Sequence, residues 1–297
     1  MAPETAAVQG DVQDGHGGST ARIAGFLHRA GAGHRRVPES WSGDLQFGVD
    51  LGTASIVLCA VDADNEPAWW DSRSVQAVRD GVVVDFAGAV AATRELVDEA
   101  EETLGVRVSH AATAAPPGVP VSDRRACHYV VEQAGVECRG VNDEISAAQE
   151  ILGVVDGAIV DVGGGSTGVG VYRNRELVSL TDLPGGGHHL DLILAGALGI
   201  SIEEAEEAKR TDGAAHLGVL KAGVERIAES IRSQCSGVDP GPVHLAGGAL
   251  LLAGADEIVA DRLGWRTVSY PNAHLITPFG IARSFAAGTA DGGTGDR

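Results

Sequence analysis

The chain has 297 residues, of which 44% are hydrophobic and 21% are charged, and its formal net charge is −19 at pH 7. A chain of this length can bury one large core or the cores of two domains of ordinary size. The negative charge argues against nucleic acid and against a membrane surface as partners, because both would repel the protein. It does not argue against a nucleotide, which backbone N–H groups and Mg²⁺ can hold locally.

Cysteine usage and hydropathy point to the cytoplasm. The four cysteines, at positions 59, 127, 138 and 235, form no Cys-x-x-Cys pair and indicate reduced, isolated thiols. No apolar segment led by Lys or Arg opens the chain, and no apolar run approaches the roughly 20 residues that span a bilayer. We therefore expect a cytoplasmic protein without a secretory signal or a membrane-spanning helix.

Residues 1–43 are rich in Gly, Ala, Asp, His and Arg and show no sustained pattern. Within them, Ile23, Phe26, Leu27 and Ala30 follow a helical spacing. One interpretation is a short helix that docks on a partner or a shell. The favoured interpretation is a disordered or frayed extension, which would make residues 1–43 dispensable for folding and for ligand binding.

A first lobe is expected over residues 44–153. In residues 47–55, Phe-Gly-Val-Asp-Leu-Gly-Thr-Ala-Ser, an apolar strand ends at Asp50 and is followed by a glycine and a hydroxyl residue. Residues 56–61 supply the next strand. Further elements are expected as helices at 90–104, 122–134 and 144–152, the last capped by Asn142 or Asp143, and as strands at 108–115 and 138–141.

A second lobe, expected over residues 154–270, repeats this pattern. Residues 159–167, Ile-Val-Asp-Val-Gly-Gly-Gly-Ser-Thr, again place an acid, glycines and hydroxyl residues after an apolar strand. Glycines let backbone N–H groups approach an anion, and the preceding Asp161 can hold a divalent cation through water. Two such turns on one chain predict two related lobes that face each other across a bound phosphate chain.

The remaining elements of the second half follow in order. A hairpin is expected over 167–180, helices over 190–198 and 202–210, a helix marked by the stripe Leu220, Val224, Ile227, Ile231 and Cys235, and a strand over 242–246. Residues 271–287 are expected to return to the first lobe through a helix at 276–287, and residues 288–297 to form a disordered tail.

Other phosphate-binding patterns fit less well. Gly163, Gly165 and Gly168 satisfy the dinucleotide fingerprint G-x-G-x-x-G. That fold needs a helix directly after the glycines and an acid about 20 residues later, whereas here the acid comes first and a strand follows. A Walker-type loop is excluded, because Gly-Lys-Ser/Thr does not occur in the chain.

Residues 44–287 resemble the actin, Hsp70 and sugar-kinase superfamily through five motifs in the expected order. They are similar to its first phosphate motif (50–53, Asp-Leu-Gly-Thr), first connecting motif (144–148, Glu-Ile-Ser-Ala-Ala), second phosphate motif (161–166, Asp-Val-Gly-Gly-Gly-Ser), adenosine motif (245–248, Leu-Ala-Gly-Gly) and second connecting segment (278–282, Pro-Phe-Gly-Ile-Ala). The resemblance implies an α/β, two-lobed actin-like ATPase fold, with duplicated RNase H-like lobes and a nucleotide cleft between them.

By this resemblance the cleft would bind ATP or ADP together with Mg²⁺. Asp50 and Asp161 would hold the metal through waters, and Glu144 and Asp161 would be the catalytic pair that orients a water molecule. The residues expected to contact the nucleotide come from four glycine-containing turns and one helix: Asp50, Gly52, Thr53, Ala54, Gly163, Gly164, Gly165, Ser166, Gly186, Gly187, Glu225, Gly247, Gly248 and Ala249.

The chain departs from the superfamily pattern in three ways. Ile145 stands where the connecting motif has proline, and no arginine follows Gly248 at the position that packs on adenine in Hsp70. The phosphate-contacting lysine of full chaperones has no clear match in the first lobe, where Arg79 is only a weak stand-in. These departures favour nucleotide binding with weak or partner-stimulated hydrolysis of ATP to ADP and phosphate.

Four other stretches, 79–86, 109–118, 186–189 and 201–210, resemble the Hsp70-like EutJ family of ethanolamine utilization proteins. This resemblance implies a chaperone or reactivating factor whose client is ethanolamine ammonia-lyase or a component of a bacterial microcompartment. The alternatives are an actin-like scaffold whose polymerisation is controlled by nucleotide, and a nucleotide-binding pseudo-ATPase. A small-molecule kinase is disfavoured, because the chain has little room for substrate-binding insertions. The sequence leaves the oligomeric state open.

Overall fold

Two five-stranded sheets organise residues 17–79 and 81–285, the part of the chain that the computed structural model describes. The first sheet has the order β3-β2-β1-β6-β7 and consists of β1 (Gln46–Leu51), β2 (Ile56–Val61), β3 (Pro67–Arg73), β6 (His110–Ala115) and β7 (Glu137–Asp143). The second has the order β10-β9-β8-β11-β12 and consists of β8 (Gly157–Val162), β9 (Ser166–Arg173), β10 (Glu176–Pro184), β11 (Val243–Ala246) and β12 (Thr267–Val268). A small hairpin pairs β4 (Val78–Arg79) with β5 (Val82–Val83).

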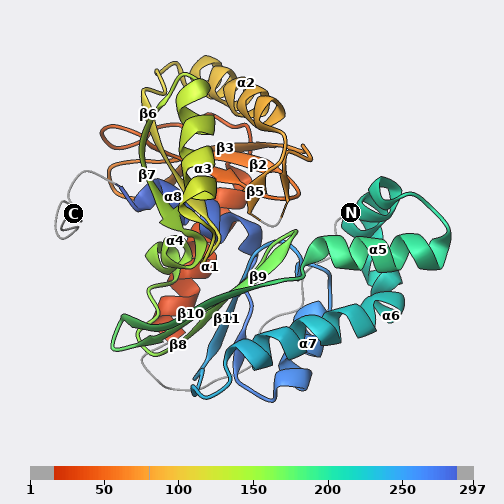
Figure 1. The fold of residues 1–297 in the computed structure, drawn as a ribbon. Helices are drawn as coiled ribbons and strands as arrows, with labels where there is room; N and C mark the ends of the chain where they lie inside the picture. The colour runs from red at the N-terminus through yellow and green to blue at the C-terminus, as the bar shows by residue number, and fades with distance from the viewer. Residues whose placement is uncertain (1–16, 80, 286–297) are drawn as a thin grey trace.

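The two sheets share one topology. In each, the first strand pairs antiparallel with the second and parallel with the fourth, so that β1, β2 and β6 correspond to β8, β9 and β11. Strands β2 and β8 are buried along their whole length, which explains their continuous apolar runs. The duplication predicted from the two glycine turns is therefore present in the strand order (Figure 1).

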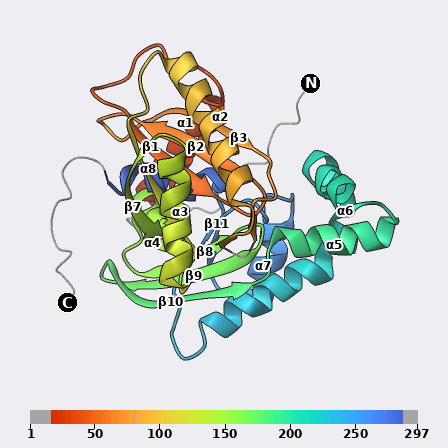
Figure 2. The ribbon, with the colours of Figure 1, turned by 45° about the horizontal axis from the view of Figure 1, so that its top comes forward.

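Helices cover both sheets. They are α2 (Phe86–Leu104), α3 (Val121–Gln133), α4 (Glu144–Leu152), α5 (Gly187–Leu198), α6 (Ile202–Gln234) and α7 (Ala255–Leu263). Asp143 caps α4 by accepting a hydrogen bond from the Ser146 N–H, as the sequence predicts. The expected helix at 202–210 and the following apolar stripe form one long helix, kinked at Asp212. Helices α5 and α6 project to one side of the second sheet in both views (Figures 1 and 2).

The last described helix, α8 (Ile276–Arg283), follows the short 3₁₀ helix η1 (Ala273–Leu275) and returns to the first lobe, where it packs on β1, β2 and α4. The contact with α4 is a close backbone approach: a Cβ added at Gly280 would lie 1.9 Å from the carbonyl oxygen of Ala147. The Cys59 thiol of β2 donates to the Pro278 carbonyl of α8 at 3.0 Å. The predicted tail at 288–297 lies outside the described residues.

Each lobe has its own apolar core, and a third buried cluster joins the two lobes. This cluster combines Ile145 and Ile151 of α4 with Ile276 and Phe279 of α8 and with Ile159 of β8. Because its members come from both halves of the chain, the lobes are connected by packing as well as by the covalent chain.

The N-terminal helix α1 (Gly17–Ala32) is part of this third cluster. The four residues of its predicted apolar stripe are buried, and Phe26 packs edge-to-face on Phe279 with ring centroids 5.6 Å apart. Asn272, which follows the second sheet, donates to the Leu27 carbonyl at 3.1 Å. The favoured interpretation of a disordered or frayed extension is therefore wrong for residues 17–32, because they form a helix whose apolar stripe fills an interlobe core. That the extension is dispensable for folding and ligand binding stays a prediction. Residues 1–16 lie outside the described part of the chain.

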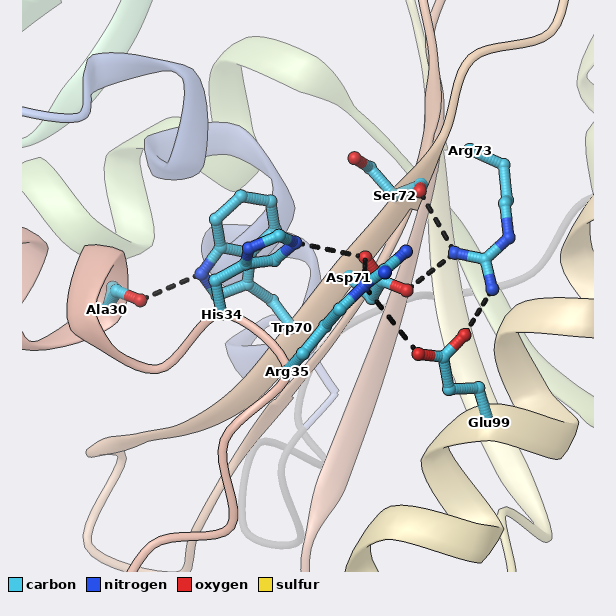
Figure 3. A network of polar contacts seen from close by, with 8 residues as sticks. All are labelled: Ala30, His34, Arg35, Trp70, Asp71, Ser72, Arg73 and Glu99. Carbon is cyan, nitrogen blue, oxygen red and sulfur yellow. Dashed lines mark hydrogen bonds and ion pairs between the residues drawn. The ribbon is translucent and has the colours of Figure 1, made fainter.

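Residues 33–36 fix this helix to the edge of the first sheet (Figure 3). The Trp70 indole donates to the Ala30 carbonyl at 2.8 Å, and the Asp71 carboxylate, only 1% exposed, accepts from Arg35 at 2.8 Å and from Arg73 at 2.5 Å. Burial raises the pKa of Asp71, but the hydrogen bonds from Arg35 and Arg73 outweigh burial and bring the pKa down to about 2.

We expect Asp71→Asn to destabilise the fold at neutral pH and to lose this effect in acid. The pKa of about 2 lies below that of an unfolded aspartate, so the ionised carboxylate stabilises the protein above about pH 4, and the stabilisation disappears as the pH falls through 2. The difference between the two pKa values corresponds to about 2.5 kcal/mol of folding stability. Urea unfolding of wild type and variant at pH 7, 4 and 2 measures it. Glu66→Gln, in an exposed pair with Arg29, is the control, and a pH-independent deficit in Asp71→Asn would contradict the assignment.

Candidate nucleotide site

Each lobe ends its first strand with an acid and a glycine turn of the same geometry. Asp50 lies near the end of β1 and Asp161 near the end of β8. In the first turn, the Gly52 N–H donates to the Ser55 carbonyl at 3.1 Å; in the second, the Gly163 N–H donates to the Ser166 carbonyl at 3.0 Å. The two motifs predicted from the sequence are therefore equivalent local structures on equivalent strands.

The two turns touch each other. A Cβ added at Gly164 would lie 3.2 Å from the Ala54 nitrogen and 3.3 Å from the Thr53 Cβ. The first lobe thus brings Thr53 and Ala54 against the glycines of the second lobe. This contact brings together the hydroxyl and backbone N–H groups that the sequence predicts to surround a phosphate chain.

Three carboxyl groups from three elements influence one another beside these turns. Burial and the charge of Asp161 raise the pKa of Asp50 to about 7. Burial raises the pKa of Glu144, the first residue of α4, and the charges of Asp161 and Asp50 raise it further. Burial also raises the pKa of Asp161, against a hydrogen bond from Thr277 that lowers it. The site thus concentrates negative charge, which a cation would stabilise.

These carboxyl groups suit a metal that arrives with a nucleotide. Within residues 17–79 and 81–285, no three His, Cys, Asp or Glu side chains converge closely enough to hold a metal by themselves. Mg²⁺ commonly takes one or two carboxylates and completes its octahedral shell with waters and substrate phosphates. Asp50 and Asp161 can supply those carboxylate oxygens, so the donor set fits hydrated Mg²⁺.

The other predicted glycines of the second lobe surround the end of β8. The Gly187 N–H donates to the Gly163 carbonyl at 2.9 Å, and a Cβ at Gly186 would lie 2.2 Å from that same oxygen. Gly247 has a positive φ, and a Cβ there would meet the Asp161 carboxylate at 2.4 Å, so only glycine fits.

Of the remaining predicted residues, all but one lie beside these. Gly165 accepts from the Gly185 N–H at 2.8 Å, Ser166 begins β9, the Ala249 N–H donates to the Val162 carbonyl at 3.1 Å, and Gly248 lies against His274.

Glu225 is the predicted site residue that the structure does not bring to the turns. It lies in the middle of α6, partly exposed, beside Val224 and Ile227, which face the core. The apolar stripe of this helix was predicted correctly, and Glu225 lies directly beside it. Its contact with a nucleotide stays a prediction.

Two residues at the site were missed from the sequence. The Lys209 ammonium lies 2.5 Å from Asp191 and donates to the Gly187 carbonyl at 3.1 Å, with its side chain only 12% exposed. Thr277 donates to the Asp161 carboxylate at 2.5 Å. A lysine that follows the glutamate-rich segment 203–208 was the one available signal for the first residue. No local pattern indicates the second, because the contact joins residues 116 positions apart.

Comparison with known proteins supports the fold and identifies proteins of similar sequence. Residues 158–283 match the family described as "Cell division protein FtsA". The chain is 36% identical over 259 residues to ethanolamine utilization protein EutJ of Salmonella typhimurium strain LT2, covering 87% of this chain and 92% of that protein. No helix in the described residues is long and apolar enough to cross a membrane.

Solved structures show the same architecture. The crystal structure of ethanolamine utilization protein EutJ from Carboxydothermus hydrogenoformans has a TM-score of 0.85 at 35% identity and covers 89% of this chain and 98% of its own. MreB5 of Spiroplasma citri, solved with ADP and with AMPPNP, has a TM-score of 0.64 at 17% identity, covering 82% of this chain and 95% of its own. The predicted α/β, two-lobed actin-like fold is confirmed.

Proposed function

The chain belongs to the EutJ family of ethanolamine utilization proteins, and from this membership we propose that it binds ATP and ADP as an Hsp70-like protein of that system. The observation that carries the proposal is the contact between two equivalent turns, each preceded by an aspartate, on opposite lobes. The solved structures of MreB5 with ADP and with AMPPNP support it, because that protein has the same fold.

In this proposal the residues of the two turns and of the adenosine motif have defined tasks. Asp50 and Asp161 hold hydrated Mg²⁺, which supplies charge neutralisation to the phosphates. Thr53, Ser166 and the glycine N–H groups surround the phosphate oxygens. Gly247, Gly248 and Ala249 lie where the adenosine would bind.

Phosphoryl chemistry at such a site would depend on positioning a water. Glu144 and Asp161 are the groups proposed for that task, and the hydrolysis they support is weak or stimulated by a partner. A second candidate is a nucleotide-binding pseudo-ATPase. It is suggested by the raised pKa of Glu144, because burial and the charges of Asp161 and Asp50 disfavour the ionised carboxylate that would accept a proton from water.

The biological role that we propose is a chaperone or reactivating factor for ethanolamine catabolic enzymes or for their microcompartment. It rests on the family membership and on a fold that can couple nucleotide to the relative position of two lobes. Release of phosphate from ATP, measured with and without purified ethanolamine ammonia-lyase, tests partner stimulation. Sedimentation with and without ATP tests the scaffold alternative.

We expect MgATP and MgADP to raise the melting temperature by several degrees, because a ligand held by both turns binds only the folded state. At a hundredfold excess over Kd the stabilisation is about 2.7 kcal/mol. Differential scanning calorimetry with Mg²⁺ alone, MgADP and MgATP measures the shift, and each sample is repeated with EDTA as the control. A midpoint that stays in place at millimolar MgATP would refute nucleotide binding.

A further inference from the structure

Thr277 holds the carboxylate of Asp161 from outside the predicted motifs. Its Oγ1 donates to Asp161 Oδ2 at 2.5 Å, and the two residues are 5% and 7% exposed. The other carboxylate oxygen, Oδ1, faces Gly247, where a Cβ would approach it to 2.4 Å. The carboxylate is thus confined on one side by a hydrogen bond and on the other by a backbone that tolerates only glycine.

The two partners of this hydrogen bond belong to different packing units. Asp161 is a residue of β8, in the sheet of the second lobe. Thr277 is the second residue of α8, which packs on β1 and β2 of the first lobe. The bond therefore ties a carboxylate of one lobe to a helix that rests on the other.

Helix α8 also packs directly on the helix that carries Glu144. One turn after Thr277, Gly280 makes the close backbone contact with Ala147 of α4, and Glu144 is the first residue of α4. A shift of α8 would therefore move the hydroxyl donor of Asp161 together with the helix that positions Glu144. Both proposed catalytic carboxyl groups depend on one short helix.

We propose that Thr277 is a positioning residue that orients the Asp161 carboxylate toward Mg²⁺ bound with nucleotide. This inference rests on the proposed function. A lone aspartate side chain can rotate about its last bond, and a fixed donor on Oδ2, together with the backbone of Gly247 beside Oδ1, limits that rotation to one orientation. Hydrogen-bond partners of metal-ligating groups set their orientation, and losing one typically costs about 10- to 100-fold in metal affinity or activity.

The alternative is that the hydroxyl only satisfies a buried carboxylate. Removing the donor would then lower the stability of the fold, because an unsatisfied buried acceptor costs free energy. Such a loss would be the same with and without metal. A positioning role instead weakens binding of the magnesium complex and leaves metal-free nucleotide nearly unaffected, so the two roles separate by their dependence on Mg²⁺.

The test compares Thr277→Val, which removes the donor at nearly constant shape, with Thr277→Ser, which keeps it. Calorimetric titration of the full chain with ATP, in Mg²⁺ and in EDTA, gives both affinities. Thr277→Val is expected to weaken MgATP binding about 10- to 100-fold and metal-free ATP binding less than about twofold, and Thr277→Ser to restore the wild-type value. Thr211→Val removes a threonine–carboxylate hydrogen bond to Glu207 on the exposed face of α6 and is the matched control.

The outcomes distinguish this inference from the proposal beneath it. Wild-type protein that binds no nucleotide overturns the proposed function and the inference with it. Two results with wild-type protein that binds MgATP would overturn the inference alone. In the first, Thr277→Val binds MgATP as tightly as wild type does. In the second, Thr277→Val loses as much affinity for ATP in EDTA as in Mg²⁺. An affinity of Thr277→Ser for MgATP as low as that of Thr277→Val would also overturn the inference. If Thr277→Val does not fold, Thr277→Ala makes the same comparison without adding any atom.

Discussion

Asp161→Asn is expected to weaken MgATP binding about 100-fold while the fold remains intact. The amide has nearly the shape of the carboxylate and can still accept the hydrogen bond from Thr277, but it withdraws a charged oxygen from the metal. Losing one such contact costs a few kcal/mol, which corresponds to this change in affinity. Isothermal titration with MgATP measures it.

The stability of Asp161→Asn without ligand should not fall together with its affinity for MgATP. Because Asp161 raises the pKa of both Asp50 and Glu144, neutralising it relieves repulsion among these neighbouring carboxylates. The melting temperature without nucleotide is therefore expected to stay the same or rise. Asp261→Asn, on the exposed side of α7, is the control for a change of one charge. An unchanged MgATP affinity in Asp161→Asn would remove Asp161 from the proposed site.

Gly280→Ala is expected to lower the stability of the protein by roughly 3 kcal/mol. The added methyl group would lie 1.9 Å from the Ala147 carbonyl oxygen and 2.5 Å from its carbon, so α8 and α4 must separate. For a chain of this size the midpoint should fall by roughly 6 to 12 °C. Thermal unfolding followed by circular dichroism measures the shift.

The matched control is Gly196→Ala in α5. That glycine is exposed, it lies within a regular helix, and an added Cβ would meet no atom within 4 Å. Alanine is favoured over glycine in helices by up to about 1 kcal/mol, so this variant should be slightly more stable than wild type. A Gly280→Ala midpoint equal to that of Gly196→Ala would show that the α4–α8 contact is not as close as described.

Much of the fold follows from local patterns. The acid that ends an apolar strand and the glycines behind it predicted both turns, and their repetition predicted the duplicated sheets. Asp143 and the apolar stripe of α6 predicted a cap and a buried face, because both depend on fixed spacings along one helix. Helix α7 (Ala255–Leu263) was missed, since its short sequence has only a weak amphipathic pattern.

The contacts that complete the site were beyond prediction for a physical reason. Thr277 and Lys209 reach the glycine turns through packing of helices that are distant in sequence, and no spacing rule encodes that proximity. A different error concerns α1. Its apolar stripe was recognised in the sequence, but the interlobe core that the stripe fills was not predicted. A few apolar residues in a polar segment predict a helix, but whether that helix is docked depends on a surface formed elsewhere.

Cys59 can report chemically on the contact between β2 and α8. Its thiol is fully buried against the Pro278 carbonyl of α8, and burial raises its pKa, so a reagent that needs the thiolate cannot attack it in the closed protein. Modification requires α8 to leave β2, and its rate follows the population of that opened form whenever reclosing is faster than the reaction. Labelling of Cys59, distinguished from the other three buried cysteines by peptide mass spectrometry, therefore measures the separation of α8 from β2 in the natural sequence.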